Sequence, residues 1–353
     1  MTESQQATVL KHLSDPGKAL RPIFTSLNGD NSWLMSFPRP ESERAATGKA
    51  FYHVAFEPWL KGAAHVFNPW FVNIAMVNSP EISTFQSLEN LVREIESAAT
   101  AHKPLVDEQQ DGQLPLDSSP LDAILLGFFL SDHLHPQTLK SFPADIPVIA
   151  TTPGINVIKP WNHFKTIRTI SNLSPSATSW QTPDLHPGEP LPKWLTPIFL
   201  PGRSELNFVF AIIWSHTVDN EEIHEVILDS PHGVKGDEKT LNAFLNSEPK
   251  TRKLAMLHGL KESSTGGIQT CYGAKGGLAL NRKVGGVKHW VVTHSSELEY
   301  TGVFMRIFGT KDTPRTVEWA LEEEHKKDPS LERSEPPNCV KVANGGSTVL
   351  TYQ

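Results

Sequence analysis

A continuous apolar segment ends directly in an aspartate and a histidine, and this junction constrains the fold most. Residues 122–130 (DAILLGFFL) carry no polar side chain after Asp122. Such a run predicts a strand that is covered on both faces, which is typical of a layered fold. It is followed by Ser131, Asp132 and His133, and a short helix is predicted over 137–140. The order strand, loop, helix therefore predicts an α/β protein with Asp132 and His133 at a strand end.

Other segments support a two-sheet arrangement. Segment 22–37 contains an Asn-Gly pair between two apolar runs, which is a strong hairpin signal because both residues accept positive φ. Apolar residues at helical spacing predict a helix over 83–99, and polar residues predict a loop over 103–120. No repeat is visible, so two sheets covered by helices are expected. Further predicted elements are strands at 51–56, 147–151, 206–214, 225–229, 254–257 and 289–293, a helix at 277–284 and a Pro-rich connection over 174–197.

Composition excludes several classes of protein. The chain has 32 basic and 39 acidic residues, a net charge of -7, and no long run of either sign. This balance argues against nucleic-acid or anionic-membrane partners. Cys271 and Cys339 form no CxxC motif, which argues against a disulfide framework or a thiolate metal site. The start of the chain lacks signal-peptide features and no apolar stretch reaches about 18 residues, so a cytoplasmic location is expected.

Polar side chains recur where predicted strands end. Glu57 follows one strand, the pair Asp132-His133 another, and Asp229 and His294 two more. Functional groups of layered α/β folds concentrate on loops held by rigid strands, so these ends are expected to converge. Taken alone, Asp132 would more often cap a helix, and Asp229 would more often accept hydrogen bonds in a turn.

The segment 126–135 resembles the His-x-His-x-Asp-His signature of the metallo-β-lactamase superfamily. In that register Phe128 and Leu130 occupy the first two histidine positions. A lactonase-like branch common in fungi is also similar at the Asn28–Trp33 hairpin, Glu57-Pro58-Trp59, Trp290–His294 and Asn344–Ser347. The resemblance spans roughly 23–350. It implies an αββα sandwich of two mixed β-sheets flanked by helices, forming one domain over 1–353, with an N-terminal extension at 1–20 and a C-terminal helix and closing strand at 311–353.

The resemblance also implies which metal ligands survive. The two histidines replaced by Phe128 and Leu130, with a third that Asn207 replaces, would hold one ion in the family. Asp132, His133, Asp229 and His294 match the set for the other ion, so one divalent metal is expected, zinc first and manganese or iron as alternatives. Either Asp229 or His232 can be aligned with the bridging ligand, and Asp229 is preferred because it ends the apolar strand.

Supporting roles follow from the same alignment. Glu57 stands where the family has a carboxylate that orients metal-binding histidines. Asp132 and His135 are the expected catalytic residues, with His135 as an alternative ligand or substrate contact. His163, His232 and His258 are expected to be structural or to lie at the rim. Phe128, Leu130, Asn207, Trp33 and Trp59 are the expected substrate pocket, which would suit a flat, aromatic or apolar small molecule.

Three functions are compatible with these residues. The first is a metal-dependent hydrolase of an ester, thioester or lactone-like small molecule that uses a single ion. The second is a non-hydrolytic lyase, isomerase or cyclase in secondary-metabolite biosynthesis, and the third is a catalytically silent binding protein. Without a Gly-x-Ser-x-Gly motif or a reactive-cysteine context, a covalent serine or cysteine mechanism has no support.

Overall fold

The computed structural model describes residues 3–15, 17–99, 120–329 and 335–352. Its largest sheet has seven strands in the order β19-β1-β2-β3-β6-β7-β8. From β19 to β3 neighbours are antiparallel, whereas β3, β6, β7 and β8 are parallel, so the sheet is mixed. The strands are β1 (Ile23–Ser26), β2 (Trp33–Pro38), β3 (Phe51–Phe56), β6 (Ala123–Leu126), β7 (Val148–Thr151), β8 (Ile167–Ile170) and β19 (Ser347–Val349).

The second sheet has six strands in the order β18-β15-β12-β11-β10-β9. It is also mixed, because β9, β10 and β11 are antiparallel and β11, β12, β15 and β18 are parallel. The strands are β9 (Leu195–Ser204), β10 (Asn207–Val218), β11 (Glu221–Asp229), β12 (Arg252–His258), β15 (His289–Val292) and β18 (Cys339–Val340).

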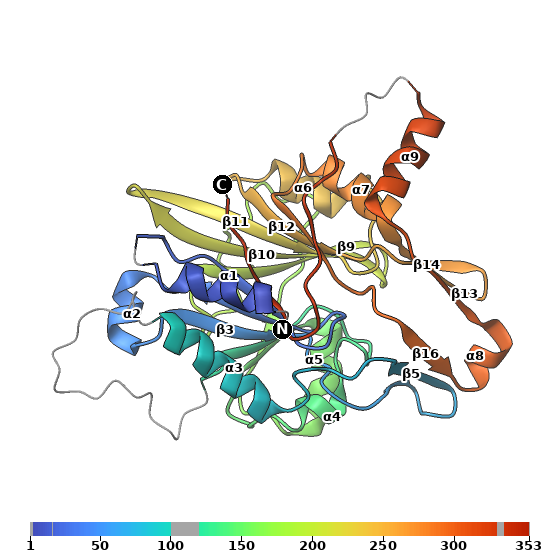
Figure 1. The fold of residues 1–353 in the computed structure, drawn as a ribbon, viewed down its shortest axis with the longest axis horizontal. Helices are drawn as coiled ribbons and strands as arrows, with labels where there is room; N and C mark the ends of the chain where they lie inside the picture. Colours follow the sequence, from blue (N-terminus) through green and yellow to red (C-terminus); the bar gives the residue numbers. More distant parts are fainter. Residues whose placement is uncertain (1–2, 16, 100–119, 330–334, 353) are drawn as a thin grey trace.

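Helices cover the outer faces of both sheets (Figure 1). On the first sheet lie α3 (Phe85–Ala98), α4 (Pro136–Leu139) and α5 (Thr152–Ile158), and on the second lie α6 (Lys239–Asn246), α7 (Gly273–Lys283) and α9 (Val317–Lys327). Three apolar cores fill the spaces between the layers. The expected αββα sandwich of two mixed sheets is therefore confirmed. The remaining helices are α1 (Glu3–Leu13), α2 (Glu41–Thr47), α8 (Val303–Phe308) and the short η2 (Lys159–Trp161).

Strand β3 shows how the sequence builds the layers. Its side chains alternate between the faces of the sheet, as the two-residue period of a strand requires. Phe51 and Ala55 join the core shared with α3, whereas Val54 and Phe56 join the core between the sheets. There the Phe56 ring stacks on Phe210 of the second sheet at a centroid distance of 5.9 Å. Both faces of β3 are thus buried and hold the strand end in place.

Two small sheets extend to one side of the sandwich in Figure 1. One contains β4 (Ala64–Val66), β5 (Val72–Met76) and β16 (Leu298–Thr301). The other contains β13 (Glu262–Thr265), β14 (Ile268–Tyr272) and β17 (Thr310–Thr313). The sequence analysis did not predict these sheets, because their strands are short and partly exposed and carry no sustained apolar alternation.

Several sequence predictions are confirmed and some boundaries change. The hairpin over 22–37 forms as β1 and β2, and strand 51–56 is found with the same bounds. The strand predicted over 122–130 stops at Leu126, because the N–H groups of Gly127 and Phe128 donate to the Glu57 carboxylate. Strand β9 lies in and beyond the predicted Pro-rich connection, and α7 begins four residues before the predicted helix. The loop predicted over 103–120 falls almost wholly outside the described residues. Within the described ranges, no helix has the length and apolarity needed to cross a membrane.

Candidate metal centre

Three buried histidines meet between the two sheets. His133 follows β6, His232 follows β11, and His294 follows β15. One ring nitrogen of each lies within 4.8 Å of the others, which makes them a group able to hold a metal ion within the described part of the chain. Because β3 and β6 are parallel, as are β11, β12 and β15, the loops at their C-terminal ends can meet at one end of the sandwich. The predicted convergence of strand ends on one site is thus observed.

Glu57 fixes the orientation of His133. The His133 Nδ1–H donates to Glu57 Oε2, while Glu57 Oε1 accepts the N–H groups of Gly127 at 3.1 Å and Phe128 at 3.0 Å. Its carboxylate therefore ties the imidazole to the end of β6. The opposite nitrogen, His133 Nε2, is buried and has no hydrogen-bond partner among the described residues. This is the arrangement of a metal-ligating histidine whose distal N–H is held by a carboxylate.

His232 and His294 face one another. The His232 Nδ1–H donates to the carbonyl of Leu206 at 3.2 Å, so its Nε2 carries a lone pair. That nitrogen lies 3.1 Å from Nε2 of His294. Two tetrahedral zinc ligands, each about 2.0–2.1 Å from the ion, stand about 3.4 Å apart. The two imidazoles thus have a separation that one ion could bridge after a small adjustment.

The electrostatics of the three imidazoles differ. Burial lowers the pKa of His133, but Glu57, Asp132 and Asp229 outweigh it and raise this pKa to about 9. Burial together with the neighbouring histidines lowers the pKa of His232 well below its usual value, and burial also lowers the pKa of His294. Nearby carboxylates thus favour positive charge at the position of His133, whereas burial favours the neutral imidazole at His232 and His294. The donor set and its acidic surroundings fit a divalent cation.

Asp132 contacts two of the three histidines. Its Oδ2 lies 3.7 Å from Nε2 of His133 and 4.0 Å from Nε2 of His294. The residue is 8% exposed, so the carboxylate borders the centre and keeps a small solvent-accessible surface. An aspartate in this position can serve as a further ligand or hold a water molecule beside the ion.

Asp229 lies outside the histidine triad. It is buried, and Oδ2 has no hydrogen-bond partner among the described residues. Burial and the nearby charge of Glu57 raise its pKa well above the usual value, and His133 opposes this only partly. The structure brings His232, the alternative in the alignment, beside His133 and His294, whereas Asp229 is not part of that group.

The turn after β11 explains why the sequence favoured Asp229 over His232. After β11, Ser230 N–H donates to Leu257 and Gly233 N–H donates back to Ser230, with Gly233 at φ +84°. This tight turn reverses the chain and returns the His232 ring to the sheet end. The sequence signal was present as Ser-Pro-His-Gly, but a turn signal does not indicate the direction of a side chain.

Other predicted site residues have structural hydrogen bonds. His135 caps α4: its Nδ1 accepts from Thr138, and its Nε2–H donates to the carbonyl of Ala63 at 3.2 Å. Asn207 donates to the carbonyl of Gly233 at 3.0 Å and accepts from Ser204 at 2.7 Å. Both side chains are thus occupied in stabilising loops and lie outside the triad.

The two tryptophans expected at the pocket are core residues. Trp33 and Trp59 are fully buried, and their indole N–H groups donate to Thr293 and to the carbonyl of Gly62. His163 and His258 have the structural roles expected of them, each donating to a backbone carbonyl. Trp33 therefore fixes Thr293, the residue before His294, by a hydrogen bond from the core.

Phe128 occupies the space beside the triad. Its ring centroid lies 5.1 Å from that of His133 and 5.6 Å from that of His232, both edge to face. Phe128 also lines a cavity of about 320 Å³, together with the apolar residues Phe129, Phe199 and Pro201 and the polar residues Thr151, Arg203, Ser204 and Glu205. Leu130 packs against the same inter-sheet core. Phe128 thus places an aromatic side chain directly beside two of the three histidines, and Leu130 adds apolar surface nearby.

Two residues of the centre have strained backbones. Glu57 has φ +45° and His294 has φ +46°, a region that side chains other than glycine rarely adopt. Such conformations cost about 1–3 kcal/mol each and persist only where surrounding contacts impose them. One of them belongs to the triad and the other holds His133, which indicates that local packing imposes the geometry of the centre on a strained backbone.

Comparison with known proteins gives structural similarity at low identity. No family model matches the chain, and no curated protein matches it by sequence. Among solved structures, a "possible metal-dependent hydrolase" from Veillonella parvula is 12% identical over 94% of this chain and 100% of its own, with a TM-score of 0.47. An isothiocyanate hydrolase from Delia radicum gut bacteria is 11% identical over 93% and 99%, with a TM-score of 0.49. A metallo-β-lactamase fold protein from Bacillus subtilis is 11% identical over 93% and 99%, with a TM-score of 0.38.

Proposed function

We propose that this chain is a metal-dependent hydrolase of the metallo-β-lactamase type that uses one divalent ion. The observation that carries the proposal is the convergence of His133, His232 and His294, whose ring nitrogens come within 4.8 Å of one another. Three protein ligands with a further position left for water or substrate are the usual composition of a catalytic zinc site. Zinc is the best fit for three imidazoles, and manganese or iron are alternatives.

A bound ion would polarise a carbonyl group and lower the pKa of a coordinated water toward about 7. The protein's own residues complete this chemistry. Glu57 keeps the proton of His133 on Nδ1 and so presents Nε2 to the ion. Asp132, at the partly accessible side of the centre, is placed to accept a proton from an attacking water. His135 plays no part in this scheme, because its ring nitrogens are engaged in capping α4 and in the bond to Ala63.

Phe128 supports the use of a single ion. It cannot ligate a metal, and its ring packs edge-on against His133 and His232. Leu130 is likewise apolar, and Asn207 is engaged by Gly233 and Ser204. The positions that the family uses for a second ion are therefore filled by groups that would exclude it.

The cavity beyond Phe128 supports an aromatic or apolar substrate. Phe128, Phe129, Phe199 and Pro201 line it with apolar surface, and the polar residues that line it are Thr151, Arg203, Ser204 and Glu205. Its volume of about 320 Å³ is at the lower end of the range for small-molecule pockets. The aromatic part of this lining favours a flat or hydrophobic group. We infer an ester, thioester or lactone-like small molecule whose apolar part enters this cavity while its carbonyl group faces the triad.

Calorimetric titration of the chelator-treated protein with zinc chloride tests the metal centre. Wild type is expected to bind one ion per chain, and His133→Ala and His294→Ala to lose that binding. His163→Ala is the matched control, because His163 hydrogen-bonds Phe142 and lies outside the triad. Absence of zinc binding to wild type, or unchanged binding in His133→Ala, would overturn the proposal.

The reaction type is tested on the zinc-loaded protein with esters, thioesters and lactones that carry aromatic or aliphatic groups. Reaction in ¹⁸O-labelled water, followed by mass spectrometry, is expected to add one labelled oxygen to the product. Turnover without incorporation would instead identify a lyase, isomerase or cyclase. Zinc binding without any turnover would favour a binding protein.

A further inference from the structure

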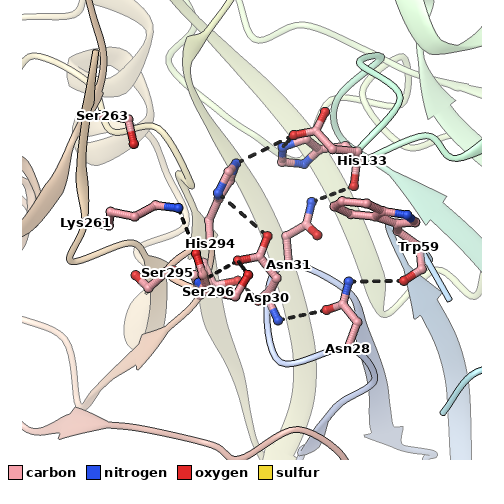
Figure 2. A network of polar contacts seen from close by, with 12 residues as sticks. Asn28, Asp30, Asn31, Trp59, His133, Lys261, Ser263, His294, Ser295 and Ser296 are labelled. Carbon is pink, nitrogen blue, oxygen red and sulfur yellow. Dashed lines mark hydrogen bonds and ion pairs between the residues drawn. The ribbon is translucent and has the colours of Figure 1, made fainter. Parts of the chain in front are cut away.

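The turn between β1 and β2 touches three of the loops that build the metal centre. This turn spans 27–32 and contains Asn28, Gly29, Asp30, Asn31 and Ser32, all of which are buried except Gly29. Figure 2 shows that side chains of this turn point toward His294 on one side and toward the Trp59 segment on the other. Most hairpin turns lie at the protein surface and expose such polar residues to water.

Asp30 holds the segment that carries His294. Its Oδ1 accepts the N–H of Ser296 at 2.9 Å and the hydroxyl of Ser296 at 2.7 Å. Its backbone carbonyl accepts the Thr293 hydroxyl at 2.8 Å and the N–H of His294 at 3.3 Å. Side chain and backbone of one residue thus bind both flanks of His294, whose φ of +46° needs such support.

The second carboxylate oxygen of Asp30 faces the imidazole itself. Oδ2 lies 3.8 Å from Nδ1 of His294, and that nitrogen has no hydrogen-bond partner among the described residues. At this distance the contact is electrostatic and not a hydrogen bond. Since Asp30 is 2% exposed and His294 is 7% exposed, water screens the attraction little. The hydrogen bond between the two Nε2 atoms needs a proton on Nε2 of His294, because Nε2 of His232 accepts. An ion that displaced this proton would leave a lone pair on Nε2, and the Asp30 carboxylate would then favour the remaining proton on Nδ1.

The rest of the turn holds the other two loops. Asn31 Nδ2 donates to the carbonyl of Asp132 at 3.0 Å. Ser32 Oγ donates to the carbonyl of Glu57 at 2.7 Å and accepts the N–H of Trp59 at 2.8 Å. One turn thus connects the segments of Glu57, Asp132 and His294, which are up to 237 positions apart in the chain.

We propose that Asp30 is a positioning residue of the metal centre, which orients His294 as Glu57 orients His133, and that the Asn28–Ser32 turn sets the spacing of the three loops. This inference rests on the proposed metal binding. Outer-shell carboxylates of this kind change metal affinity by about 10- to 100-fold when they are removed.

The test compares Asp30→Asn with Glu96→Gln. Glu96 is a matched control, because it is also 2% exposed, accepts two backbone N–H groups and contacts a histidine, His53, at 3.0 Å. It lies beside the start of β3, at the opposite end of that strand from Glu57. Both substitutions replace a buried carboxylate by an amide of nearly equal size, and only the first faces a proposed ligand.

Zinc affinity is measured by calorimetry on the chelator-treated full chain, and the ligand field by the visible absorption of the cobalt-substituted protein. Asp30→Asn is expected to bind zinc about 10- to 100-fold more weakly and to shift the cobalt bands. Glu96→Gln is expected to retain wild-type affinity and bands. Ser296→Ala, which removes one of the two bonds to Oδ1, is expected to weaken zinc binding by a smaller factor and serves if Asp30→Asn does not fold.

Wild-type zinc affinity and cobalt bands in Asp30→Asn and Ser296→Ala would overturn the positioning role while leaving the metal centre intact. An equal loss of affinity in Glu96→Gln would also overturn it, because the effect would then be one of general stability. If wild type itself binds no zinc, the proposed function fails first.

Discussion

Replacing His232 and Asp229 separately distinguishes the two possible ligands after β11. His232→Ala removes one of three imidazoles from the triad, whereas Asp229→Asn keeps the size of a side chain that lies outside it. Four-ligand structural zinc sites bind with about 10–16 kcal/mol, so one ligand contributes about 2.5–4 kcal/mol. At 1.4 kcal/mol for each factor of ten, His232→Ala is expected to weaken zinc binding roughly 60- to 700-fold.

Asp229→Asn is expected to change zinc affinity by less than about tenfold. Asp229 is not part of the histidine group, and asparagine keeps the size of its buried side chain. The free energy of unfolding should change by no more than about 1 kcal/mol. Both affinities come from calorimetric titration with zinc chloride at one pH. A larger loss of affinity in Asp229→Asn than in His232→Ala would refute this assignment.

Three further predictions concern Phe128 and Glu57 beside the triad and the control carboxylate Glu96. Phe128→Ala should lower the free energy of unfolding by about 3–5 kcal/mol in urea titrations while zinc still binds, whereas Phe67→Ala, at an 89% exposed ring, should change it by less than about 0.5 kcal/mol. Glu57→Gln should weaken zinc binding by about 10- to 100-fold, since it removes the charged acceptor for His133, and undiminished affinity would contradict that role. Burial raises the pKa of Glu96, but His53 and the backbone N–H groups outweigh it and keep this pKa below its usual value of 4.5. The stability that Glu96 adds over Glu96→Gln should therefore be full at neutral pH and shrink as the pH falls below about 4.5, and a constant difference down to pH 3 would contradict the sign.

Local patterns in the sequence predicted most of the central strands. The Asn-Gly turn and the flanking apolar residues identified β1 and β2, and the apolar run before Gly127 identified β6. Both signals act over a few residues, so no tertiary information is needed to read them. Strand β9 was missed because Pro197 and Pro201 indicate a loop. The two prolines are tolerated because β9 lies at the edge of its sheet, where a strand can lack some backbone N–H donors.

The site was predicted in part for the same reason. His294 lies two residues after β15, and His133 lies seven residues after β6 in the loop that the apolar run leads into. The strand pattern therefore placed both near strand ends, and their resemblance to a known motif gave them a role. The orientation of His232 depends on a turn with Gly233 at positive φ, which the sequence suggests without fixing the direction of the ring. Asp30 reaches His294 across 264 positions of the chain, and only the assembled sandwich shows that contact. Trp33 and Trp59 were expected at the pocket but are buried in the core, and residue type alone does not distinguish a core tryptophan from one that lines a pocket.

A crystal structure of the zinc-soaked protein, with anomalous diffraction at the zinc edge, tests the central claim most directly. We expect one anomalous peak per chain at about 2.0–2.1 Å from a ring nitrogen of each of His133, His232 and His294. Asp229 should lie outside this coordination distance. Two peaks about 3.5–4 Å apart, or no peak at the three histidines, would contradict the single-ion centre.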